Sequence, residues 1–225
     1  MAAGYHFRVS HEPESPSDTD LLAAWRAGDR RAGAALFERH APSIAYFFRN
    51  KLPGGAEDLV QQTFLGLVEG HERLEGTSVR AYLFGIAHNL LRKHLRKQAR
   101  SPGFDPGVSS AAELAPGPST ILARNREQRL LLEGLRRIPL DHQVALELFY
   151  WEELNAAQIA EIVGVSHSAM RSRLVKARQL LEQAIGELAE TPALLASTLG
   201  GLDDWAAALR ARTDSTHTSK PGAGS

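Results

Sequence analysis

The stretch that decides the fold is residues 155–181, NAAQIAEIVGVSHSAMRSRLVKARQLL. Asn155 suits the N-cap of a short helix, because its side-chain oxygen can accept hydrogen bonds from the free amides of the first turn. Gly164 tolerates the positive φ that a tight turn between two helices needs. Ser166 then caps a second helix, expected over about residues 167–183. The stretch therefore predicts a helix-turn-helix.

The second helix of this stretch has two faces of different chemistry. Its apolar stripe consists of Met170, Leu174, Ala177 and Leu181, and its opposite face carries Ser168, Arg171, Ser172, Val175 and Lys176. An apolar back and a front of arginine and serine suit the major groove of DNA. Arg171 is the candidate for base-edge acceptors, with Ser168 and Ser172 beside it; Arg173, Lys176 and Arg178 are the candidates for phosphate contacts. A plain helical hairpin within a bundle is the alternative.

The rest of the 225-residue chain predicts an all-α protein, because its apolar residues recur with helical spacing almost everywhere. A stretch rich in proline and glycine separates two helical blocks, which indicates two small helical domains joined by a flexible linker, the second domain holding the helix-turn-helix. The expected divisions are a disordered leader (1–18), a first domain (19–98), the linker (99–119), a second domain (120–186) and a partly helical C-terminal extension (187–225).

The charge distribution favours contact with a polyanion, although the formal net charge is zero. Two islands contain basic residues and no acidic ones: Arg80, Arg92, Lys93, Arg96, Lys97 and Arg100 lie in the first, and Arg171, Arg173, Lys176 and Arg178 in the second. Two such islands on a neutral chain suggest two contacts with nucleic acid. The alternative for either island alone is a solvated helix face.

Several classes of protein are not expected. The chain has no cysteine, which excludes disulfides and thiolate metal sites. His88 and His94 are six residues apart, so they lie on different helical faces and predict no metal site; His88 is interpreted as a packed or capping residue. The sequence contains no signal peptide, no membrane-spanning segment and no catalytic constellation. We therefore expect a cytoplasmic protein that is not an enzyme and needs no cofactor.

The first block contains two helices with unusual outer faces. Over residues 57–69, the inward stripe is expected to be Val60, Phe64, Leu67 and Val68, and the outward face Asp58, Gln61, Gln62, Leu65 and Glu69. An exposed leucine among glutamines can dock a partner helix, with an ordinary amphipathic surface as the alternative. Over residues 79–97, Gly85, Asn89, Arg92 and Arg96 share a narrow arc that suits nucleic acid. The polar loop 74–78 before this helix can hold an unstacked base.

These residues resemble the sigma-70 family of RNA polymerase sigma factors. Residues 57–65, EDLVQQTFL, look like the polymerase-binding helix of region two. Residues 80–89, RAYLFGIAHN, resemble the following helix, which reads and helps melt the minus-ten element. Residues 159–166, IAEIVGVS, and 170–178, MRSRLVKAR, are similar to the region-four helix-turn-helix, which binds the minus-thirty-five element. The presence of these two regions alone, with a short linker, is the extracytoplasmic-function arrangement.

The resemblance implies partners and site residues. Asp58, Gln61, Gln62 and Leu65 would bind core RNA polymerase, at the clamp helices of its largest subunit. Arg80, Asn89, Arg92 and Arg96 would contact minus-ten DNA, and Ser168, Arg171, Ser172, Arg173, Lys176 and Arg178 minus-thirty-five DNA. The flap of the second-largest subunit and an anti-sigma factor are further partners that the family suggests. A stand-alone helix-turn-helix regulator and a helical RNA-binding adaptor are the alternatives.

Two of the chain's departures from the family pattern bear on its structure. Gly66 and Gly70 are expected to weaken the polymerase-binding helix by up to about 1 kcal/mol each. About forty residues follow the recognition helix, and Leu195, Leu199, Leu202, Trp205 and Leu209 repeat helically there. We expect this extension to fold back on one domain and modulate activity, with a weakly ordered tail as the alternative.

Overall fold

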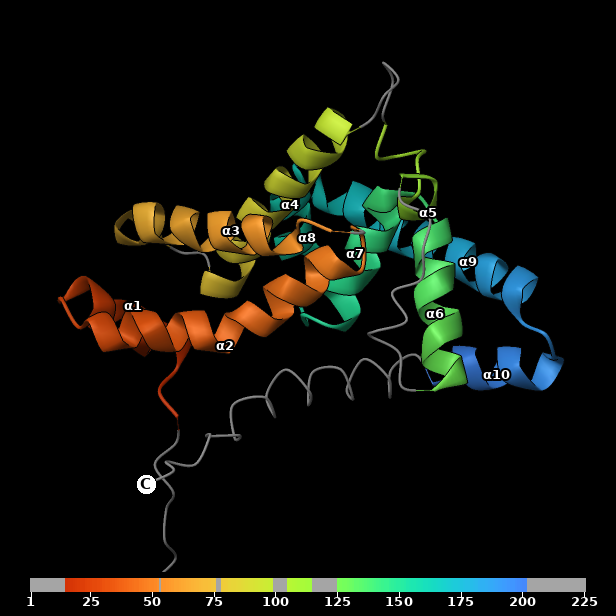
Figure 1. Cartoon of the computed structure of the whole chain (residues 1–225), viewed down its shortest axis with the longest axis horizontal. Helices are drawn as coiled ribbons and strands as arrows, with labels where there is room; N and C mark the ends of the chain where they lie inside the picture. The colour runs from red at the N-terminus through yellow and green to blue at the C-terminus, as the bar shows by residue number, and fades with distance from the viewer. Residues whose placement is uncertain (1–14, 53, 76–77, 99–104, 115–124, 202–225) are drawn as a thin grey trace, which may run out of the picture.

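The computed structural model describes residues 15–52, 54–75, 78–98, 105–114 and 125–201. Within these ranges the regular elements are helices, with one isolated bridge between Ser110 and Pro139 (Figure 1). The helices are α1 (Asp18–Arg26), α2 (Arg30–Arg49), α3 (Ala56–Gly70), η1 (His71–Arg73), α4 (Val79–Gln98), α5 (Ala111–Leu114), α6 (Arg126–Arg137), α7 (Leu140–Tyr150), α8 (Ala156–Val163), α9 (His167–Leu188) and α10 (Pro192–Gly200). The all-α prediction is confirmed.

The first helix of the first domain begins within one residue of the expected end of the leader. Ser17 caps α1 through a capping box with Asp20. Asp18 then forms ion pairs with Arg39 and His40 on α2, both at 2.7 Å. Burial alone would raise the pKa of Asp18, but the hydrogen bonds and charges of these two partners outweigh it and lower the pKa to about 2. The ion pairs fasten α1 to α2.

The inward stripe of α3 differs from the expected one. Phe64 and Leu67 are buried as predicted, but Val60 is only partly buried and Val68 is 52% exposed. The remaining buried positions of α3 are Ala56, Leu59, Thr63 and Gly70. The prediction for Val68 was wrong. The buried stripe of α3 lies about one residue further round the helix than the spacing of its apolar residues suggests.

Gly66 and Gly70 are contact points where the first-domain helices approach closely. A β-carbon on Gly70 would lie within van der Waals distance of the Tyr82 ring and clash with its hydroxyl, and one on Gly66 would lie 3.2 Å from Ile86. Both partners are on α4. The two glycines, expected only to weaken α3, therefore allow the close α3–α4 packing.

The second domain has the turn that the sequence predicts. Asn155 accepts hydrogen bonds from the amides of Ala157 and Gln158, and Gly164 has a φ of 75° at the end of α8. Ser166 accepts a hydrogen bond from the amide of Ala169 and so caps α9. The helix-turn-helix is confirmed, although α9 runs to Leu188, five residues beyond the expected end.

The C-terminal extension folds back on the second domain as far as it is described. Thr191 caps α10, whose leucines Leu194, Leu195 and Leu199 pack against the apolar cluster of α6 and α9. Ser197 also donates a hydrogen bond to Glu127 on α6, at 3.3 Å. The helical repeat expected at Leu202, Trp205 and Leu209 lies outside the described residues.

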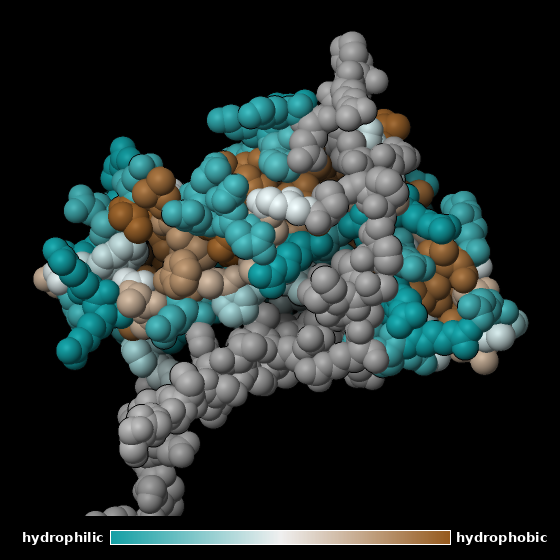
Figure 2. All heavy atoms as spheres, viewed as in Figure 1, coloured by the Kyte–Doolittle hydropathy of each residue, from teal (hydrophilic) through white to brown (hydrophobic). Residues whose placement is uncertain are grey.

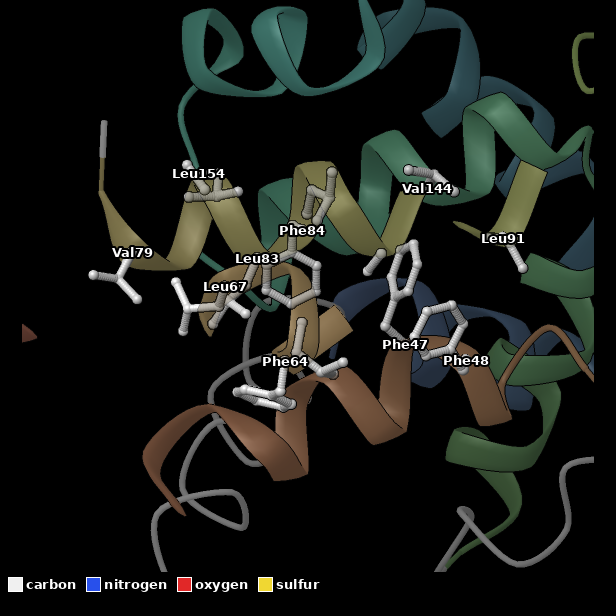
Figure 3. Close-up of a cluster of buried hydrophobic side chains, with 14 of the residues drawn as sticks. Phe47, Phe48, Phe64, Leu67, Val79, Leu83, Phe84, Leu91, Val144 and Leu154 are labelled. Atoms are coloured by element: carbon white, nitrogen blue, oxygen red, sulfur yellow. The ribbon is translucent and has the colours of Figure 1, made fainter. Parts of the chain in front are cut away.

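One of the two hydrophobic clusters in the described chain spans both domains. Phe47, Phe84 and Leu91 of the first domain belong to the same buried cluster as Val144 and Leu154 of the second (Figure 3). The main contact runs between α4 and α8, with α7 beside them (Figure 1). The described chain is therefore closed, with its helix-turn-helix packed against the first domain.

The middle of the expected linker is packed on the second domain. The amides of Leu140 and Asp141 donate hydrogen bonds to the carbonyls of Ser109 and Pro106, both at 3.0 Å. Ala111, at the start of α5, is fully buried. Residues 105–114 therefore belong with the second domain in this closed arrangement.

Candidate nucleic-acid and polymerase interfaces

The face of α9 predicted to read DNA is open to solvent. Ser168, Arg171, Ser172, Val175, Lys176 and Arg178 are exposed. Arg173 is partly buried and lies 3.5 Å from Asp141, while Arg178 pairs with Glu182 at 3.2 Å. The structure therefore brings the six predicted minus-thirty-five residues to one helix and leaves Arg171 and Lys176 at the surface.

An apolar groove beside Arg171 adds residues that sequence reasoning missed. The groove, of about 690 Å³, is lined by Phe149, Ala156, His167, Ser168, Arg171, Ser172, Leu174 and Val175. Phe149 is 42% exposed and Val175 62% exposed. Phe149 lies in the last turn of α7, a helix whose other apolar residues are mostly buried, so the spacing of its apolar residues gave no sign of an exposed ring. The recognition face thus combines basic, hydroxyl and apolar groups.

The outer face of α3 carries all four residues predicted to bind polymerase. Asp58, Gln61, Gln62 and Leu65 are exposed, and Leu65 exposes 54% of its surface. Two apolar residues that the prediction did not include enlarge this face: Val68 on α3, and Phe37 on α2, which is 46% exposed and packs against the Phe64 ring at a tilt of 56°. Apolar side chains are visible among hydrophilic ones over this part of the molecule (Figure 2).

A second groove, of about 250 Å³, adjoins the α3 face. Phe37, Ala45, Ala56 and Val60 supply apolar lining, and Arg49, Glu57 and Gln61 supply polar lining. Grouped apolar exposure with a polar rim is typical of a surface that docks a partner. The α3 face, defined here as Phe37, Asp58, Gln61, Gln62, Leu65 and Val68, is therefore larger than the sequence suggested.

The residues predicted to contact minus-ten DNA fall into two groups on α4. Asn89 and Arg96 are exposed and Arg92 is partly buried, and helical spacing places these three on one flank. Arg80 precedes Asn89 by nine residues, so it lies on the other side of α4. There it contacts Glu152 of the second domain at 3.3 Å. The structure thus brings three of the four residues together and holds the fourth elsewhere.

The start of the loop before α4 is fixed by α1. The guanidinium of Arg26 donates two hydrogen bonds to the carbonyl of His71, at 2.9 and 2.7 Å, and a third to that of Leu74. The Trp25 ring stacks on the His71 ring with centroids 3.9 Å apart. These two residues were missed because the contacts join positions over forty residues apart. Residues 76–77 of the predicted loop lie outside the described residues.

His88 is packed inside the protein, as predicted. His88 is 2% exposed and its pKa is lowered to about 4 by burial, with the nearby charge of Arg92 contributing in the same direction. Within the described ranges, no cluster of three or more histidine or acidic side chains is placed to hold a metal ion. No helix in those ranges is long and apolar enough to cross a membrane.

The exposed basic helix of a helix-turn-helix, joined to a second helical domain, is the architecture of a DNA-binding transcription factor. Comparison with known proteins gives the family. The model of sigma-70 region 2 matches residues 36–101, and that of sigma-70 region 4 matches residues 128–181. The chain therefore belongs to the sigma-70 family, as an extracytoplasmic-function (ECF) sigma factor.

Individual relatives agree with this assignment. The chain is 33% identical to the RNA polymerase sigma factor CarQ of Myxococcus xanthus over 172 residues, 74% of this chain and 97% of that protein. It is 26% identical to the ECF RNA polymerase sigma-E factor of Haemophilus influenzae over 78% of this chain and 98% of that one. The solved structure of CnrH in complex with the cytosolic domain of CnrY shares the fold, with a TM-score of 0.53 at 19% identity, over 76% of this chain and 99% of that chain.

The family assignment decides among the alternatives. Two sigma regions in the expected order do not support a stand-alone helix-turn-helix regulator. Sigma factors are transcription initiation factors, so the chain belongs with these and not with enzymes.

Proposed function

We propose that this sigma factor binds core RNA polymerase through the α3 face and directs it to promoters read by α4 and α9. The observation that carries the proposal is the separate exposure of three surfaces within two sigma regions: the α3 face, the Asn89–Arg96 flank and the front of α9. Each surface has the chemistry that its proposed partner requires.

The α3 face suits a helical protein partner. Leu65, Val68 and Phe37 offer apolar area, and Asp58, Gln61 and Gln62 offer hydrogen-bonding groups around it. An apolar centre with a polar rim is the usual anatomy of a protein interface. The proposed partner is the pair of clamp helices of the largest polymerase subunit, with the flap of the second-largest subunit against the second domain. An anti-sigma factor remains a predicted further partner.

The two DNA surfaces suit different elements. The Asn89 amide can hydrogen-bond a base edge, while Arg92 and Arg96 can hold phosphates of the minus-ten element. The Arg26 contacts fix one end of the loop proposed to hold a flipped base. On α9, Arg171 is proposed to read a base of the minus-thirty-five element, with Ser168 and Ser172 beside it.

Two substitutions test the two kinds of contact. Leu65→Glu places a charge at the centre of the α3 face, and we expect the Kd for core polymerase to rise at least about tenfold, since 1.4 kcal/mol corresponds to tenfold. Val108→Glu is the matched control, because Val108 is 71% exposed and lies outside the α3 face. Equal polymerase binding by the Leu65→Glu variant and the wild type would contradict the proposed role of the α3 face.

Arg171→Ala tests promoter reading. We expect the holoenzyme to lose about 1–3 kcal/mol of promoter affinity if Arg171 contacts a base. Arg129→Ala, at an exposed position on α6, is the matched control. Both holoenzymes are measured on the same promoter fragment at one salt concentration, and normal initiation by Arg171→Ala from every cognate promoter refutes the role of this side chain.

A further inference from the structure

The contact between the two domains contains a buried charge cluster. We define it as Asn50 and Lys51, after α2 in the first domain, and Arg136, Gln143 and Glu147 in the second. Asn50 and Lys51 are fully buried, and Glu147 is 2% exposed. A buried charge is costly unless it is paired, so the charged groups of this cluster need partners that are buried with them.

Glu147 is the centre of the cluster. Its carboxylate accepts hydrogen bonds from the Asn50 amide at 2.7 Å and from Gln143 at 2.9 Å, and its other oxygen pairs with the ammonium of Lys51. Lys51 also donates to the carbonyl of Phe47 and lies 3.9 Å from the Phe47 ring centroid. Burial lowers the pKa of Lys51, and the charge of Glu147 opposes that shift. Gln143 is the only one of these three Glu147 partners within the second domain.

Two further contacts cross the same interface. Arg136 donates a hydrogen bond to the Asn50 carbonyl at 2.8 Å. Arg80 on α4 pairs with Glu152 at 3.3 Å. Arg80 is itself one of the residues predicted to contact minus-ten DNA. The interface therefore occupies a side chain that the family resemblance assigns to minus-ten DNA.

The closed arrangement is too small to contact both promoter elements at once. The minus-ten and minus-thirty-five elements are about 25 base pairs apart, or roughly 85 Å at 3.4 Å per base pair. A compact chain of this length has a radius of gyration of about 17 Å and is roughly 45 Å across. Because α4 and α9 lie in one compact body, the domains must separate before each reaches its element.

We propose that the closed form is a self-restrained state of the free sigma factor, held by the Lys51–Glu147 pair at the centre of the charge cluster. The inhibitory role rests on the proposed function, whereas the closure itself does not. Separation of the domains rehydrates Lys51 and Glu147 together, so neither is left as a lone buried charge. Removing one charge from the closed form leaves the other buried without its partner, which drives the equilibrium toward the open form.

Distance measurements in solution test the closure. Because the natural chain has no cysteine, Glu69→Cys on α3 and Gln179→Cys on α9, both at exposed positions, provide the only sites for a donor and an acceptor dye. We expect the wild type to show mainly one short-distance population by single-molecule energy transfer. Glu147→Gln should lower the ratio of closed to open molecules about 100-fold or more, because it leaves the buried Lys51 charge without its partner.

Two further variants keep the test specific. Lys51→Met with Glu147→Leu replaces both charges by apolar groups and should return the ratio to within about tenfold of the wild type. Glu190→Gln removes the same charge from an exposed pair with Arg126 and should leave the ratio unchanged. Circular dichroism confirms that each variant is folded. If Glu147→Gln stays closed, or if the double variant opens as far as the single one, the charge pair does not hold the domains.

Initiation assays test the inhibitory role separately. Only the open form is expected to initiate. A variant with a larger open fraction should therefore reach half-maximal promoter-specific initiation at a lower sigma concentration, and that concentration should fall by the same factor as the open fraction rises. If Glu147→Gln opens the chain but leaves this concentration unchanged, closure is not inhibitory and the proposed function stands. If no variant initiates, the wild type included, the proposed function fails, and the inhibitory role fails with it; the distance measurements still report the closure.

Discussion

Glu152 makes the stability of the closed chain depend on pH near neutrality. Its side chain is buried where the domains meet. Burial raises the pKa of this carboxyl to about 7, and the neighbouring negative charge of Glu147 acts in the same direction. The charges of Arg80 and Lys51 and a hydrogen bond with Ser43 oppose the shift. In the unfolded chain the same carboxyl has a pKa of 4.5. The folded chain therefore holds a proton that the unfolded chain releases over this range.

The direction and size of the effect follow from that difference. A carboxyl whose folded pKa is raised favours the folded state fully below the unfolded pKa, and this contribution is lost as the pH rises through the folded pKa. The window is thus about pH 4.5 to 7. A difference of 2.5 units at 1.36 kcal/mol each gives an upper value of about 3 kcal/mol. Stability should fall by up to this amount as the carboxyl ionises.

Urea unfolding of the wild type and Glu152→Gln from pH 5 to pH 8 measures the effect. Glutamine resembles the protonated acid and does not titrate, so subtracting the two curves removes the contributions of the other ionisable groups. We expect the wild type to lose about 2–3 kcal/mol relative to the variant across this range, on the linkage argument above. Glu190→Gln, at an exposed site, should run parallel to the wild type. The reasoning is refuted if the difference in free energy of unfolding between the wild type and Glu152→Gln stays constant with pH.

Three other predictions concern stability and the extension. Asp18→Asn should cost about 2 kcal/mol at pH 7 in urea unfolding, a penalty that shrinks as the pH falls from 3.8 toward 2; a penalty unchanged at low pH contradicts the ion-pair account. Gly134→Ala places a β-carbon 2.8 Å from Ile185 and should cost about 1–3 kcal/mol, whereas Gly186→Ala meets open space and should gain up to about 1 kcal/mol. The two melting temperatures should therefore move in opposite directions. Ending the chain after residue 187 removes α10 and should lower the melting temperature, because the α10 leucines leave the apolar cluster of α6 and α9. Unchanged promoter output from this variant would count against a regulatory extension.

Local structure could be predicted from the sequence where a single residue satisfies a helix cap or a turn by itself. Asn155, Gly164 and Ser166 each satisfy a cap or turn by themselves, so the helix-turn-helix followed from the sequence. Leu65 was correctly assigned to the surface because it lies among glutamines. Val68 was not, since its exposure depends on the angle at which α4 approaches α3. Gly66 and Gly70 take part in that contact, because a β-carbon at either position would meet Ile86 or Tyr82 of α4.

The closed arrangement was harder to foresee, because its parts look like surface residues when each domain is considered alone. Gln143 and Glu147 are four residues apart on α7, the spacing of an ordinary solvent-facing pair. Yet Val144, Ala145, Leu146 and Leu148, which surround them, are all buried. A helix that is apolar nearly all round must be covered on every side, so a polar pair within it requires a buried polar partner. Asn50 and Lys51, on the other side of the linker, are that partner, and their contact with Glu147 makes the proposed restraint a property of both domains together.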